Sequence, residues 1–231
     1  MRHWLVLLFG VMSAALQVSA QEPVEVQGRI SVRHLPGEGA DNSSVVVWLK
    51  PLATNVDVKP ATESFRLVQK DKRFTPHLLV VPVGTRVEFP NLDPFFHNVF
   101  SLYEGKRFDL GLYEAGGSRF VRFTRPGVSY IFCNIHPGMS AVVVALATPY
   151  YAVTNSSGEY TMRGVMPGSY QLNVWYERAA PEDLAKLSRT VVVTGPTTVK
   201  PVRVAAVENP LPHQNKYGMD YDVSPPYEQG R

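Results

Sequence analysis

Residues 130–147 read YIFCNIHPGMSAVVVALA, two apolar runs separated by a short segment that contains a cysteine, a histidine and a methionine. Runs of Val, Ile, Tyr and Phe on either side of a Pro-Gly turn are typical of two β-strands joined by a tight loop. We therefore predict strands at 129–132 and 141–147, with the loop between them at one end of a sheet. Binding and redox residues are often found on such loops, because the sheet holds them in place.

The rest of the chain repeats this strand pattern. Short runs rich in Val, Tyr and Phe are separated by Gly, Pro, Asn and Ser, and helix-forming patterns are scarce, which predicts an all-β protein. Residues 103–118, which are rich in Gly and charge, are expected to form a loop, and 179–187 a short helical turn. Further strands are predicted at 24–32, 45–49, 64–68, 78–81, 86–89, 95–102, 119–123, 150–154, 159–162, 170–176, 190–193 and 198–205.

Residues 1–20 have the features of a secretory signal. A short basic start at Met1-Arg-His is followed by an apolar run over 4–16 and by small residues at 18–20, so we expect cleavage before Gln21. The apolar run is too short to span a bilayer, and no later segment is long and apolar enough. We therefore predict an exported protein without a membrane span, located in the periplasm.

The net charge and the cysteine content limit which kinds of protein this chain can be. The formal net charge is +3, and removal of the signal takes away Arg2 alone, which leaves +2. So small a net charge gives no reason to expect that the protein binds nucleic acid. The chain has one cysteine, Cys133, so it has no internal disulfide. In an oxidising compartment such a thiol is expected to be buried, paired with another chain or bound to a ligand.

The spacing around Cys133 favours a metal ligand. Soft copper centres for electron transfer use a thiolate and two imidazoles, with a weak axial thioether. The loop offers Cys133, His136 and Met139 at C-x2-H-x2-M spacing. A fourth ligand has to come from a neighbouring strand, and His97 is the natural candidate because it follows a turn and precedes a strand.

Three other interpretations of Cys133 remain open at this point. Zinc would suit the cysteine and the histidines, although a thioether is not a zinc ligand. A catalytic Cys–His pair is disfavoured because the sequence does not place an Asn or Asp where it would orient the histidine. A buried cysteine with unrelated neighbours is the remaining possibility.

The motifs around these residues resemble cupredoxin domains of the plastocyanin and amicyanin type. They read Asn91-x-Asp93-x3-His97-Asn98-Val99 and Tyr130-x2-Cys133-x2-His136-Pro137-x-Met139, and the likeness covers about 64–147. The resemblance implies a Greek-key β-sandwich and one type 1 copper ion. It also implies that the backbone of Asn98 donates a hydrogen bond that steadies the sulfur. The implied copper ligands are His97, Cys133, His136 and Met139.

The same resemblance implies an electron carrier and not an enzyme. Copper oxidases and nitrite reductases link their electron-entry copper to a second copper through a histidine beside the cysteine, whereas Cys133 is flanked by Phe132 and Asn134. Redox partner proteins are then expected to dock transiently near His136. The alternative is a copper protein that delivers, stores or senses the metal without carrying electrons.

A second resemblance covers about 148–206. The pattern N-S-S-G-E-Y…V-M-P-G-S-Y-Q-L over 155–172 is similar to carboxypeptidase regulatory-like (transthyretin-like) domains, which are small β-sandwiches. Their opening strand pair is missing after residue 147 but is present within 21–61. We therefore hypothesise that 21–61 complete this sandwich and that the cupredoxin-like part, 62–147, is inserted. Similar two-part exported proteins are sometimes labelled methylamine-utilisation proteins. Residues 207–231 are expected to be a disordered tail.

Overall fold

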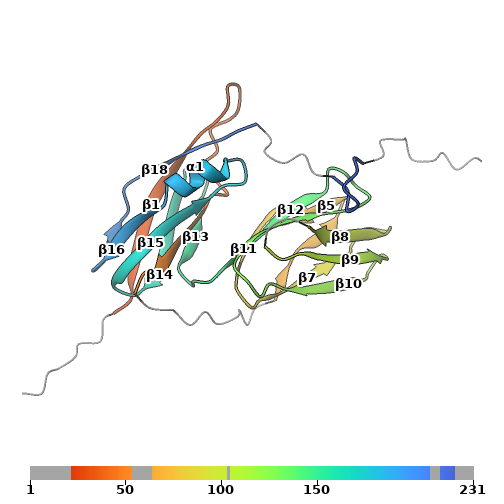
Figure 1. The fold of residues 1–231 in the computed structure, drawn as a ribbon, viewed down its shortest axis with the longest axis horizontal. Helices are drawn as coiled ribbons and strands as arrows, with labels where there is room; N and C mark the ends of the chain where they lie inside the picture. The colour runs from red at the N-terminus through yellow and green to blue at the C-terminus, as the bar shows by residue number, and fades with distance from the viewer. Residues whose placement is uncertain (1–21, 54–63, 103–104, 209–213, 222–231) are drawn as a thin grey trace, which may run out of the picture.

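The computed structural model describes residues 22–53, 64–102, 105–208 and 214–221. Within these ranges the chain has eighteen strands and one short helix, α1 (Pro181–Lys186). The prediction of an all-β protein is confirmed. Figure 1 shows two groups of strands, which we call the central module (β3–β12) and the outer module (β1, β2 and β13–β18). No helix among the described residues is long and apolar enough to cross a membrane.

The central module is a β-sandwich. Its five-stranded sheet has the order β6-β12-β11-β8-β9, and its three-stranded sheet has the order β10-β7-β3. Side chains of both sheets, such as Phe89 and Val143, share one buried hydrophobic cluster. The strands are β3 (Phe65–Arg66), β4 (Val68–Lys70), β5 (Arg73–Thr75), β6 (Leu78–Pro82), β7 (Arg86–Pro90), β8 (His97–Ser101), β9 (Phe108–Tyr113), β10 (Ser118–Arg122), β11 (Gly127–Phe132) and β12 (Ser140–Leu146).

Strand β12 is apolar at almost every position because both of its faces are buried. Successive side chains of a strand point to opposite faces. The odd-numbered residues 141, 143 and 145 belong to the core of the central module, and the even-numbered residues 142, 144 and 146 lie at the junction with the outer module. A strand covered on both faces reads as a continuous hydrophobic run. The junction cluster contains Val46, Val80, Val142, Val144, Leu146 and Trp175.

The outer module takes its first two strands from the N-terminal part of the chain. β1 pairs with β14, β17 and β18, and β2 lies between β13 and β15. Among the described residues, neither strand forms a ladder with the central module. This is the pairing that the insertion hypothesis requires. The strands are β1 (Val24–Arg33), β2 (Val46–Pro51), β13 (Tyr151–Val153), β14 (Glu159–Val165), β15 (Gly168–Trp175), β16 (Arg189–Val193), β17 (Thr197–Thr198) and β18 (Val202–Ala205).

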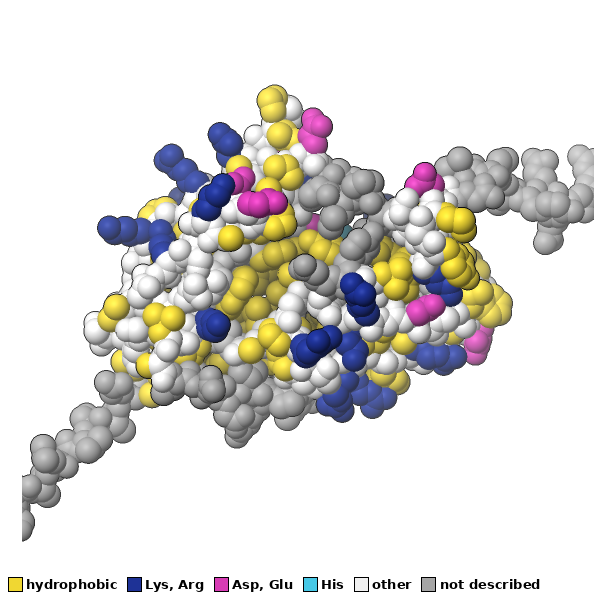
Figure 2. Space-filling view, viewed as in Figure 1, with side chains coloured by type: hydrophobic (Ala, Val, Ile, Leu, Met, Phe, Trp, Pro, Cys, Tyr) yellow, Lys and Arg dark blue, Asp and Glu magenta, His cyan; other side chains and the backbone are white. Residues whose placement is uncertain are grey.

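The two modules are also linked at the surface. Figure 2 shows hydrophobic side chains where the modules meet, and Lys and Arg side chains on the lower part of the central module. Beside the junction, His77 and Glu177 form an ion pair, with Nε2 of His77 2.6 Å from the Glu177 carboxylate. The Nδ1 atom of His77 is 3.1 Å from the carbonyl oxygen of Ser140. His77 therefore has one partner from each module.

Two segments differ from the sequence-based expectation. Within 103–118, expected to be a loop, β9 pairs with β8 through His97↔Tyr113 at the edge of the sheet. The alternation of polar and apolar residues in β9 is weak because one face of the strand is only partly buried and Gly111 has a φ of +67°.

In the tail, residues 214–221 form a compact turn, in which the Asn215 side chain accepts hydrogen bonds from the backbone of Tyr217 and Met219. The predicted signal and the rest of the tail lie outside the described residues, apart from residues 207 and 208.

Candidate metal centre

The predicted loop joins β11 to β12, and we call residues 133–139 the cysteine loop. A hydrogen bond from Cys133 N to Met139 O (3.1 Å) joins its ends, and one from Met139 N to His136 O (3.0 Å) closes the turn within it. Pro137 and Gly138 lie at the turn and are exposed. This tight closure brings the side chains of Cys133 and His136 to the same side of the loop, facing the start of β8.

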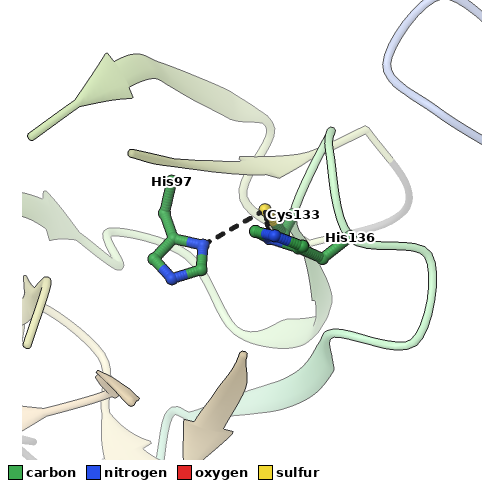
Figure 3. A group of neighbouring side chains, drawn as sticks. All are labelled: His97, Cys133 and His136. Carbon is green, nitrogen blue, oxygen red and sulfur yellow. Dashed lines mark hydrogen bonds between the residues drawn. The ribbon is translucent and has the colours of Figure 1, made fainter. Parts of the chain in front are cut away.

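Three side chains meet at this end of the sandwich, as Figure 3 shows. The Sγ atom of Cys133 lies 3.7 Å from Nδ1 of His97 and 3.5 Å from Nδ1 of His136. The candidate ligand atoms of these three residues all lie within 4.8 Å of one another. These three residues are among the four ligands predicted from the sequence, and the structure brings them together from β8 and the cysteine loop.

Burial differs between the three. His97 and Cys133 have no exposed surface, whereas His136 is partly exposed. Met139, the predicted fourth ligand, is 1% exposed and packs in the same hydrophobic cluster as Cys133. The sulfur of Cys133 is therefore shielded from water, and the cluster contacts solvent through the His136 side.

His97 is oriented by Asp93, a residue that the sequence analysis quoted in a motif but did not place in the site. The Nε2 atom of His97 is 2.7 Å from Oδ2 of Asp93, and both side chains are buried. A carboxylate accepts hydrogen bonds, so Nε2 of His97 carries the hydrogen of this contact. In the neutral imidazole, Nδ1 then keeps its lone pair. Hydrogen bonds of this kind fix the tautomer and the ring plane of metal-binding histidines.

Asp93 is itself held in the ionised form. Burial alone would raise the pKa of Asp93, but three hydrogen bonds, from Lys72 N, the His97 ring and Asp71 N, together lower it below its usual value. The two backbone donors lie in the turn between β4 and β5, at 3.0 Å and 2.7 Å. Asp93 thus links the β4–β5 hairpin to the imidazole of His97.

His136 is kept in the neutral form. Burial lowers its pKa first, and the nearby His97 and Lys72 lower it further, against the opposing charge of Asp93. A neutral imidazole has a free lone pair, which is the form that binds metals. The environment of His136 therefore suits a ligand at neutral pH.

Aromatic rings border the two imidazoles. The Phe95 ring is half-buried, 5.2 Å from the His97 ring and 5.7 Å from the His136 ring, measured between centroids. Phe96 is 55% exposed. Of these two neighbouring rings, Phe95 is the one that packs against the candidate ligands.

Asn98, the predicted supporting residue, is buried beside His97. Its side-chain amide donates a hydrogen bond to Oδ1 of Asp109 at 2.7 Å. Its own amide oxygen has no hydrogen-bond partner among the described residues. These contacts concern the Asn98 side chain, and the hydrogen bond expected from its backbone N–H to the Cys133 sulfur stays a prediction.

The donor set fits a soft metal ion better than a catalytic cysteine. One thiol sulfur and two imidazole Nδ1 atoms, with a buried methionine in the same cluster, are the ligands that copper centres prefer. The expectation that no Asp orients a histidine beside Cys133 is wrong, because Asp93 orients His97. A Cys–His–Asp arrangement is thus present, but a nucleophile has to reach its substrate, and the Cys133 side chain is fully buried.

Comparisons with known proteins gave structural similarity without a sequence match. No family model matches the chain, and no curated protein matches it. A purple cupredoxin from Nitrosopumilus maritimus is similar over 36% of this chain and 100% of its own length, at 24% identity and a TM-score of 0.33. A reduced amicyanin variant is similar over 40% of this chain and 97% of its own length, at 22% identity and 0.34. A copper-containing nitrite reductase from Thermus scotoductus SA-01 matches over 42% of this chain, with 25% identity and 0.35, but only 25% of that protein is covered. These TM-scores are low, so the case for a metal site rests on the side-chain geometry.

Proposed function

We propose that this protein binds one copper ion of type 1 and carries single electrons between partner proteins. His97, Cys133 and His136 would hold the metal, with Met139 as a weak fourth ligand. The observation that carries the proposal is the convergence of three ligand atoms within 4.8 Å at a largely buried position. Copper supplies the chemistry, because it changes by one electron between two stable oxidation states.

The surrounding residues would prepare the site before any metal arrives. Asp93 holds the Nε2 proton of His97 and so leaves Nδ1 free. Burial of Cys133 keeps water away from the sulfur. Because the ligands are already oriented, little rearrangement is needed when the oxidation state changes, and such preorganisation favours fast electron transfer.

Electrons would enter and leave on the His136 side. His136 is the partly exposed member of the cluster, and several large apolar side chains near it in sequence or on the neighbouring turn are exposed. These are Leu92 (56%), Phe96 (55%) and Ile135 (45%). Weak, transient redox complexes need only a small contact surface. We therefore propose that redox partner proteins dock here, and the mild net charge of the chain gives no reason to expect nucleic acid.

The cellular setting and the outer module are part of the same proposal. The signal-like sequence at 1–20 supports export to the periplasm, where an unpaired thiol benefits from being metal-bound. The outer module, which has the carboxypeptidase regulatory-like pattern, would act as a binding or spacing module.

The rival function is copper delivery, storage or sensing, which the same ligands would support.

Repeated redox cycling of the copper-loaded protein separates the two functions. An electron carrier retains its copper through many cycles of reduction and oxidation, and a chelator removes the reduced ion slowly. A delivery protein passes its reduced copper to the chelator within the first cycles. Loss of copper at that stage would contradict the electron-carrier proposal, and Cys133→Ser serves as the control that removes the thiolate.

A further inference from the structure

The C-terminal segment returns from the outer module to the metal centre. Residues 214–221, which we call the strap, form the dark-blue turn in Figure 1, beside the end of the central module that carries β5, β8 and β12. The strap is internally ordered. Asn215 N donates to Met219 O at 2.9 Å, Gly218 N donates to Asn215 O at 3.0 Å, and Gly218 takes a φ of +75°. A turn that is closed in this way loses less conformational freedom when it docks.

Two hydrogen bonds join the strap to the cysteine loop. The hydroxyl group of Tyr221 donates to the carbonyl oxygen of Cys133 at 2.8 Å. The backbone N–H of Lys216 donates to Oδ1 of Asn134, the next residue, at 2.9 Å. The strap therefore contacts the backbone of the candidate thiolate ligand itself and the side chain that follows it.

A third contact reaches the other side of the site. Nζ of Lys216 lies 2.9 Å from Oδ2 of Asp109 in β9, and the Lys216 side chain is mostly buried. Oδ1 of the same carboxylate accepts a hydrogen bond from the side-chain amide of Asn98, which follows His97 in β8. The strap thus contacts the cysteine loop directly and is connected to β8, the strand that carries His97, through Asp109.

We propose that the strap is part of the metal centre, with Lys216 and Tyr221 as positioning residues that hold the cysteine loop, and that its docking is coupled to copper binding. The coupling rests on the proposed function. The strap orders the backbone of the loop whose side chains bind copper, so each event makes the other more favourable. Thermodynamic linkage requires this effect to be reciprocal.

The first test needs no metal. In the metal-free full-length protein, the variant Lys216→Ala/Tyr221→Phe releases two of the three contacts and should let the loop open more often. We expect Cys133 to react with iodoacetamide several-fold faster than in the wild type. Met219→Ala is the matched control, since it shortens a side chain of the same strap that is 58% exposed, and the hydrogen bonds of Met219 within the strap are made by its backbone. The wild-type rate is expected for this control. An unchanged rate in the double variant would overturn the positioning role.

The second test uses copper alone as the ligand. Loss of outer contacts to metal ligands typically weakens metal binding by about 10-fold to 100-fold. We expect about 10-fold weaker Cu(I) binding in the double variant by chelator competition, because the backbone contact of Lys216 remains. Copper should also slow hydrogen exchange at 214–221 in the wild type. Equal affinity and copper-independent exchange would overturn the coupling. A wild type that binds no copper would overturn the proposed function and the coupling, while the alkylation rates would still decide the positioning role.

Discussion

The variant Asp93→Asn tests the metal centre through a residue that is not itself a ligand. Asn has nearly the same shape as Asp but carries no charge, and one of its two acceptor oxygens becomes an NH2 donor. In the wild type, three donors converge on the carboxylate, from Asp71 N (2.7 Å), Lys72 N (3.0 Å) and His97 Nε2 (2.7 Å). Asn cannot accept all three, so at least one donor loses its partner.

The size of the effect follows from burial. Asp93 is 4% exposed, and leaving a buried donor unpaired costs about 1–3 kcal/mol. For a protein of 150–250 residues, each kcal/mol lowers the melting temperature by about 2–4 °C. We therefore expect the metal-free variant to melt about 2–12 °C below the wild type. Because His97 loses its orienting carboxylate, copper affinity should fall by about 10-fold to 100-fold.

The assays are thermal unfolding of the metal-free protein and chelator competition for copper. Asp183→Asn is the matched control, since the ion pair of Asp183 with Lys186 is exposed and such pairs contribute at most about 1 kcal/mol. The control should melt close to the wild type and bind copper with the same affinity. Equal melting temperatures and equal copper affinity for Asp93→Asn and the wild type would refute the role assigned to Asp93.

Two further predictions concern the scaffold. The hydrogen bond with Glu177 raises the pKa of His77, so the pair stabilises the protein at pH values below the ordinary histidine pKa and loses this effect as pH rises through the raised value. Glu177→Gln should therefore lower the melting temperature more at about pH 5.5 than at about pH 9. The difference should be equivalent to under about 1 kcal/mol, because the His77 side chain is half-exposed. A larger loss at the higher pH would contradict the stabilising ion pair between His77 and Glu177. Gly158 has a φ of +80°, and a Cβ there would lie 1.9 Å from the carbonyl oxygen of Ile30. Gly158→Ala should destabilise the outer module by about 2 kcal/mol or more, and an unchanged unfolding curve would be inconsistent with this packing.

Much of the fold can be predicted because hydrophobic alternation and turn residues are local signals. The loop between β11 and β12 is expected from Pro137-Gly138 between two apolar runs. Its spacing points to Cys133 and His136, and His97 is expected from a neighbouring strand; these three residues meet in the structure. A domain pattern whose first strands are missing at the expected place led to the hypothesis that residues 21–61 pack with the C-terminal sandwich, and in the structure β2 pairs with β13 and β15. In both cases a short motif constrained a long-range contact.

The remaining features depend on contacts that leave little trace in the sequence. β9 is a half-exposed edge strand that contains a glycine, so its alternation is too weak to separate it from a loop. The strap lies 75 residues or more beyond the cysteine loop, and its polar composition is equally typical of a solvated tail. Asp93 precedes His97 by four residues, and the hydrogen bond between them exists only because the turn before β8 folds the two side chains together.

A Cu(II) titration followed by visible absorption shows whether Cys133 is a copper thiolate. We expect a strong thiolate-to-copper band that saturates at about one copper per chain, bleaches on reduction and is absent in Cys133→Ser. We also expect the loaded protein to resist alkylation at Cys133. A protein that stays colourless after copper loading, with Cys133 freely alkylated, would contradict the account.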